Sequence, residues 1–203
     1  MKEEDGKDGS PRMWEIRPEE PRDAPHIEAL VAKSFGPGRH AKSAWRLREG
    51  VHAVEGLRFV AVEGDRFRGS VRFWPVAIGN ESALLLGPLA VDAELRGQGI
   101  GLALMLRGIE DARARGHRAI ILVGDAPYYA RAGFAPLPER QVRFPGPVDG
   151  ARILGLALVP GAVETLRGEV RRARIDEPVC ADGAPLATRE FLKHQTAGEQ
   201  TIE

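Results

Sequence analysis

The residues with the clearest capacity for chemistry form a short glycine-rich loop, Arg96-Gly97-Gln98-Gly99-Ile100-Gly101. Apolar residues spaced by threes and fours follow it as far as Gly116, which predicts an amphipathic helix with the loop at its N-terminus. The first N–H groups of a helix have no partner within it, and the aligned peptide dipoles place partial positive charge there. Glycines let a ligand approach the backbone closely, and Arg96 adds a cation. The loop therefore predicts a site for a phosphate or pyrophosphate.

Two familiar phosphate-binding motifs do not fit this loop. A Walker A loop ends in Gly-Lys-Ser/Thr, whereas this loop ends in Gly-Ile-Gly-Leu. A dinucleotide fingerprint places G-x-G-x-x-G directly after a strand, but here the glycines run G-x-G-x-G behind a polar connector. The spacing therefore disfavours a nucleoside triphosphatase and a flavin or nicotinamide enzyme.

A second motif follows the helix. Residues 118–124 (RAIILVG) predict the next strand, and the segment YYARAGF at 128–134 comes after it. An apolar run at 84–91, interrupted by Gly87-Pro88, precedes the loop and predicts a strand with a bulge. In this order, the loop and the tyrosine segment resemble the coenzyme A loop and the aromatic-Tyr-x-x-x-Gly-Phe segment of the GNAT superfamily of N-acetyltransferases.

The resemblance implies a fold and an activity. The fold is α/β (α+β, three layers), the GNAT fold, with a mixed central sheet flanked by helices and strands 2–4 antiparallel, the central strand being splayed. The activity is an acetyl-CoA-dependent N-acetyltransferase that moves an acetyl group to a primary amine by direct attack in a ternary complex. Acetyl-CoA is then a co-substrate, and no metal is implied. An acyl-CoA binding or sensing module on the same fold, without turnover, is the alternative.

The resemblance also implies roles for particular residues. The backbone of the splayed strand would pair with the pantetheine arm, and Arg96 with the loop amides would hold the pyrophosphate. The implied cofactor-binding residues are Leu89, Ala90, Val91, Arg96, Gly97, Gln98, Gly99, Ile100, Gly101 and Leu102. Tyr129 takes the position of the catalytic residue that protonates the departing thiolate, and a phenol is protonated at neutral pH. Tyr128 is interpreted as its packing partner.

Two parts of the family's site are not matched by residues in this chain. Many members carry an Asn before the tyrosine, whereas this chain has Gly124-Asp125-Ala126-Pro127, in which Asp125 is predicted to cap the following helix. The sequence does not identify the general base. Glu63, Glu81 and His40 are candidates by approximate location only.

Several predicted elements must position these residues. Alternating or continuous apolar runs predict strands at 13–17, 57–63, 67–78, 84–91, 118–124, 141–144 and 152–158. Helical spacing predicts helices at 22–35, 40–48 and 162–173, besides the one after the loop, whose apolar face is expected to hold Leu102, Met105, Leu106, Ile109 and Ala112. The domain organisation expected is a flexible tail at 1–12, a GNAT domain at 13–160, and a C-terminal helix with a poorly defined extension at 161–203.

Composition limits the other classes of function. Lys and Arg total 29 in 203 residues and are balanced by 29 Asp and Glu, so neither nucleic acid nor an anionic membrane is expected as a partner. The single cysteine, Cys180, excludes an intrachain disulfide and a cysteine-rich metal site. No long apolar run or signal peptide is recognisable, which favours a cytoplasmic protein. The expected partner is a small-molecule or peptide amine acceptor, and a homodimer is left open.

Overall fold

The computed structural model describes residues 14–41 and 43–173, so the predicted tail at 1–12 and the chain from 174 onward lie outside it. Nine strands of this part of the chain form the sheet: β1 (Glu15–Pro18), β2 (Arg58–Glu63), β3 (Arg66–Ile78), β4 (Glu81–Val91), β5 (Ala119–Val123), β6 (Ala135–Pro136), β7 (Val142–Arg143), β8 (Ile153–Ala157) and β9 (Gly168–Arg172). The helices between them are α1 (Ala24–Phe35), α2 (Ser43–Arg46), α3 (Ile100–Ala114) and α4 (Ala126–Ala130), with short 3-10 helices η1 (Pro21–Asp23), η2 (Pro37–Ala41), η3 (Ala93–Leu95) and η4 (Gly150–Arg152).

The sheet is mixed. Its main order is β1-β2-β3-β4-β5-β8-β6, with β9 paired to β3 and to β7. Strands β2, β3 and β4 are antiparallel neighbours, and the chain then crosses over through α3 to lay β5 parallel to β4. A parallel neighbour needs such a long crossover connection. The predicted α/β class and the antiparallel arrangement of strands 2–4 are confirmed.

Strand β4 separates from β5 part-way along its length. The two strands pair at only two positions, beginning with Leu84 and Ile120, whereas β4 remains paired with β3 as far as Val91. The register between β3 and β4 shifts opposite Gly87-Pro88. A bulge bends a strand and increases its local twist. The interruption predicted from the sequence and the splayed central strand are therefore both present.

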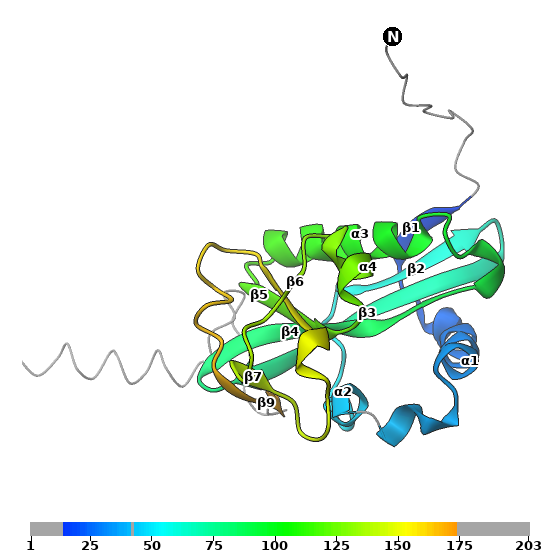
Figure 1. Cartoon of the computed structure of the whole chain (residues 1–203). Helices are drawn as coiled ribbons and strands as arrows, with labels where there is room; N and C mark the ends of the chain where they lie inside the picture. Colours follow the sequence, from blue (N-terminus) through cyan, green and yellow to red (C-terminus); the bar gives the residue numbers. More distant parts are fainter. Residues whose placement is uncertain (1–13, 42, 174–203) are drawn as a thin grey trace, which may run out of the picture.

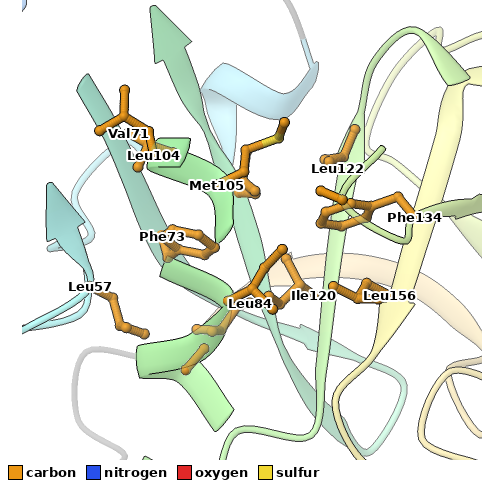
Figure 2. Close-up of a cluster of buried hydrophobic side chains, with 14 of the residues drawn as sticks. Leu57, Val71, Phe73, Leu84, Leu104, Met105, Ile120, Leu122, Phe134 and Leu156 are labelled. Carbon is orange, nitrogen blue, oxygen red and sulfur yellow. The ribbon is translucent and has the colours of Figure 1, made fainter. Parts of the chain in front are cut away.

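Apolar clusters lie on both faces of the sheet, and the two largest are on opposite faces. Helices α3 and α4 cover one face, and α1 and α2 lie on the other (Figure 1). In the first core, Leu104 and Met105 of α3 pack over sheet residues that include Phe73 and Ile120 (Figure 2). The second core contains Leu47, which follows α2, together with residues of β7, β9 and their connections. Side chains of β4 alternate between the two faces, as the period of a strand requires.

The buried side of α3 differs from the predicted face. Leu106 is 47% exposed, so its assignment to the apolar face is wrong. The buried residues of α3 are Ile100, Gly101, Leu104, Met105, Gly108, Ile109 and Ala112. A Cβ atom at Gly108 would collide with the ring of Phe73. Because glycine lets α3 approach β3 at this point, the buried stripe runs through Gly108 and turns Leu106 toward solvent.

The helix predicted over 162–173 is also wrong. Its second half forms β9, which pairs antiparallel with residues 76–78 of β3. Strand β2 pairs with β3 only up to Arg72, so this end of β3 has an open edge on the β2 side. Leu166 and Val170 are buried, but they lie after a turn and in an extended segment, not on a helix. Pairing with the open edge outweighed a weak helical period, and the sheet extends beyond the predicted boundary at 160.

Candidate active site

A cleft with a volume of about 350 Å³ opens between the diverging half of β4 and the N-terminus of α3, within the usual range of small-molecule sites. Its walls come from the end of α1, the second half of β4, the loop before α3, and α4. The lining residues are Ser34, Phe35, Leu89, Ala90, Val91, Leu95, Arg96, Gly97, Gly99, Ile100, Gly101, Leu102, Tyr128, Tyr129 and Arg131. Of the residues predicted for the site, Gln98 is the one that does not line this cleft.

The N-terminus of α3 presents unpaired donors to the cleft. Ala103 makes the first i to i−4 hydrogen bond of the helix, to the carbonyl oxygen of Gly99 at 2.9 Å. The N–H groups of residues 100–102 therefore have no partner within the helix, and a helix of 15 residues carries a substantial dipole. Gln98 differs because its N–H already donates to the carbonyl oxygen of Leu95 at 3.3 Å. This end of α3 is suited to an anion.

Two arginines border the same end of the cleft. Arg96 and Arg131 both line it and are exposed, and within residues 14–41 and 43–173 neither forms an ion pair with a carboxylate. Guanidinium groups bind phosphate through charge-assisted hydrogen bonds. Arg96 was predicted from the loop. The sequence analysis did not identify Arg131 as a site residue. The only feature that could have indicated it is a positive charge two residues after Tyr129 in the motif.

The second half of β4 offers backbone groups to the cleft. Residues 89–91 pair with β3 on one side, and β5 no longer pairs with them on the other. In antiparallel pairing, successive residues direct their N–H and C=O groups to alternate sides. Part of this segment therefore directs free N–H and C=O groups into the gap between β4 and β5. An extended ligand can pair with these groups there, as an added strand does.

Tyr129 lies on α4, at the inner wall of the cleft. Its ring packs edge-on against Tyr128 and Phe134, with centroid separations of 5.1 and 6.0 Å. Burial raises the pKa of Tyr129 to about 12, and Tyr128 adds to this, while the charges of Arg48 and Arg152 act in the opposite direction. The hydroxyl therefore keeps its proton at neutral pH, and it can serve as a donor but not as a base.

Comparison with known proteins decides the family. The profile of the Acetyltransferase (GNAT) family matches residues 24–134, which is more than half of the chain. The chain belongs to the GNAT family.

Relatives of this GNAT chain match it over most of their length. It is 36% identical over 146 residues to the uncharacterized N-acetyltransferase YhbS of Escherichia coli K12, which covers 70% of this chain and 87% of YhbS. The crystal structure of E. coli YhbS in complex with CoA has a TM-score of 0.66 at 30% identity, covering 83% of this chain and 95% of that one. The crystal structure of a GNAT acetyltransferase from Brucella melitensis in complex with acetyl-CoA has a TM-score of 0.59 at 28% identity. The match covers 79% of this chain and 96% of that one.

Tyr128 in this GNAT chain has a second contact that the sequence did not reveal. Its predicted packing against Tyr129 is confirmed, but its hydroxyl also lies against the first turn of α3. A Cβ at Gly101 would collide with that hydroxyl. Burial raises the pKa of Tyr128 as well, so both tyrosines are protonated donors at neutral pH. Tyr128 therefore belongs to the wall of the cleft beside the anion site.

The acidic and histidine residues suggested as a GNAT general base lie outside the cleft lining. Glu63 is tied in an ion pair with Arg68 at 2.7 Å. Glu81 begins β4, at the end of the strand opposite the cleft. His40 is exposed and packs edge-on against Trp45. The general base therefore stays unassigned.

Asp125 is the N-cap residue of α4, as predicted, but its side chain makes no capping hydrogen bond. Its backbone carbonyl accepts from the N–H groups of Tyr128 and Tyr129 instead, at 3.1 and 3.2 Å. Within the described ranges, no group of three or more His, Cys, Asp and Glu side chains is placed to hold a metal ion. None of the helices described there is both long and apolar enough to cross a bilayer.

Proposed function

We propose that this GNAT protein is an acetyl-CoA-dependent N-acetyltransferase that moves the acetyl group to a primary amine by direct attack in a ternary complex. The relatives from E. coli and B. melitensis, solved with CoA and acetyl-CoA, support the choice of coenzyme. The observation that carries the proposal is a protonated, partly buried tyrosine in the same cleft as a helix N-terminus suited to an anion and an unpaired strand edge.

The coenzyme is proposed to lie along the cleft. Its pyrophosphate sits at the N-terminus of α3, where the N–H groups of residues 100–102 and the guanidinium groups of Arg96 and Arg131 meet. The pantetheine arm pairs with the backbone of residues 89–91. This arrangement brings the thioester to the gap between β4 and β5, beside Tyr129.

The chemical step forms a C–N bond and breaks a C–S bond. The neutral amine attacks the acetyl carbonyl carbon, and the electron pair of the C=O bond moves to oxygen. A β4 N–H directed into the gap stabilises this oxyanion, as an oxyanion hole does. The intermediate then expels the thiolate, to which Tyr129 donates a hydrogen bond and its proton. The amine loses its extra proton to solvent, and Tyr129 regains one from solvent before the next turnover.

Two measurements test this function. Thermal denaturation with acetyl-CoA, NAD and ATP compares ligands that share a phosphate-bearing nucleotide, because a ligand that binds only the folded protein raises its melting temperature. Thiol release from acetyl-CoA is then followed with a panel of amines, after subtraction of the rate without amine. A shift with acetyl-CoA together with amine-dependent thiol release is expected. A shift without release from any amine indicates a binding module, and a shift with NAD or ATP alone overturns the proposal.

A further inference from the structure

Arg48 is a partly buried cation that does not line the proposed coenzyme cleft. It follows α2 on the face of the sheet opposite α3, next to Leu47 of the second core. Its Nε has no solvent contact and no hydrogen-bond partner. Within residues 14–41 and 43–173, no carboxylate forms an ion pair with it. Its guanidinium instead lies 5.3 Å from the centre of the Trp45 ring, which contacts it as a cation–π partner.

Other poorly exposed arginines of the fold have carboxylate partners. Arg68, with 12% of its side chain exposed, pairs with Glu63 and Asp92 at 2.7 and 3.0 Å. Arg72, with 18% exposed, pairs with Glu19 at 2.7 Å. A charge taken out of water is costly unless an opposite charge compensates it. Arg48 has no carboxylate partner within residues 14–41 and 43–173, so its guanidinium can pair with an anionic ligand.

The guanidinium of Arg48 borders the gap between β4 and β5. A Cβ at Gly87, in the bulge where β4 turns away, would lie 2.9 Å from Nη2 of Arg48, so glycine leaves room for the guanidinium there. The carbonyl oxygen of Gly87 already accepts a hydrogen bond from Nε1 of Trp74. The charge of Arg48 also acts on Tyr129, where it opposes the rise in pKa that burial causes.

Arg48 is separate from the site proposed for the coenzyme's pyrophosphate. Arg96, Arg131 and the N-terminus of α3 line the coenzyme cleft, whereas Arg48 does not. Arg48 reaches the gap from the side of α2, opposite the helix that holds the phosphates. An acceptor molecule that approaches the thioester from this side meets Arg48 next to the reacting centre.

We propose that the acceptor amine carries a carboxylate, and that Arg48 selects it by pairing with that carboxylate while the amino group faces the thioester. This inference rests on the proposed N-acetyltransferase function and names its substrate class as small amino-carboxylates. A guanidinium matches a carboxylate through two parallel N–H···O bonds, and the site gives it a desolvated partner. Arg48 is then a specificity-determining residue, and no covalent step is assigned to it.

The wild-type protein provides the first test. Glycine, β-alanine and 4-aminobutyrate are each compared with the corresponding carboxamide, alongside putrescine as a dicationic amine, by amine-dependent thiol release from acetyl-CoA. At least one amino acid is expected to exceed its own amide by about tenfold to a hundredfold in kcat/KM, the range for a lost hydrogen bond to a charged group. Equal rates for every acid and amide pair, or a preference for putrescine, overturn the proposal while leaving the N-acetyltransferase function intact. No thiol release with any amine contradicts the proposed function itself.

Variants supply the second test. Arg48→Gln should raise KM for the preferred amino acid by about tenfold or more and leave the rate with its carboxamide unchanged, and Arg48→Lys should restore part of the preference. Arg46→Gln, an exposed change of equal charge on α2, is the matched control and should behave as wild type. A binding readout that needs no turnover is calorimetry of the N-acetyl amino acid with CoA-loaded protein. If Arg48→Gln lowers kcat/KM equally for the amino acid and for its carboxamide, Arg48 acts on the thioester, and its role in selecting the acceptor is overturned.

Discussion

Replacing Arg48 by methionine should stabilise the unliganded protein. Burial lowers the pKa of Arg48 from 12.5 to about 9, because the desolvated guanidinium has no counter-ion in the described part of the chain. Desolvation without a counter-ion places a free-energy penalty on the charged form. Methionine keeps the length of the side chain and removes the charge.

The net gain is smaller than the full penalty. The substitution also removes the cation–π contact with Trp45, which is worth roughly 0.5–2 kcal/mol. Substitutions of buried charges by apolar residues of similar volume commonly stabilise by about 1–4 kcal/mol. A net increase of roughly 1–3 kcal/mol is therefore expected for Arg48→Met. For a domain of this size that corresponds to a rise in melting temperature of about 2–10 °C.

The assay is thermal and urea denaturation at neutral pH in a buffer without carboxylates. Arg46→Met, on the exposed side of α2, is the control and should stay within about 0.5 kcal/mol of wild type. Adding CoA and the N-acetyl derivative of the preferred amino acid should stabilise wild type more than Arg48→Met, because only wild type can pair with the carboxylate. If Arg48→Met is less stable than both wild type and Arg46→Met, the guanidinium has a stabilising partner and the reasoning is refuted.

Three further predictions concern the coenzyme cleft. Gly99→Asp should abolish measurable acetyl-CoA binding by calorimetry, because the new carboxylate would occupy the anion site. The space around Gly99 is open, and Asp adopts the left-handed backbone of this position (φ +84°) at less cost than most residues, so the circular dichroism should stay unchanged. Retained affinity would mean that the loop does not hold phosphate. Arg96→Ala should weaken coenzyme A by about tenfold to a hundredfold and spare a truncated thioester without the diphosphate, and equal losses would argue against a phosphate contact. Tyr129→Phe should lower kcat roughly 10²-fold at similar KM for acetyl-CoA. Because its pKa is raised, Tyr129 keeps its proton throughout the assay range, so the ratio of the wild-type kcat to the variant kcat should be constant from about pH 7 to 10. A kcat ratio that falls near pH 9 would contradict that pKa.

The sequence alone determined the parts of the site that depend on local chain geometry. The helix start at Ile100, the glycines before it and the strand interruption at Gly87-Pro88 are all set by neighbouring residues. Helix capping, backbone freedom at glycine and the loss of a donor at proline act over a few positions, so the pattern carries them directly. Tyr129 was found for a similar reason, because its motif is contiguous.

Only the tertiary structure decided which residues meet across long separations. Nothing in the sequence distinguishes Arg48 from the other arginines, and only the fold brings its guanidinium beside Gly87. Gln98 falls within the loop motif, yet it does not line the cleft, and its N–H already donates to the carbonyl oxygen of Leu95.

The two elements that sequence periodicity misassigned have the same cause. The segment 162–173 has helical spacing, but its second half pairs as a strand with the open edge of β3. Leu106 is exposed because Gly108, which lets Phe73 approach, lies on the buried side of α3. Apolar spacing reports that a residue can be buried, but the neighbour that buries it lies far along the chain. The desolvation of a charge, the exposed edge of a strand and the close approach of a helix are properties of the packed molecule, and local sequence does not contain them.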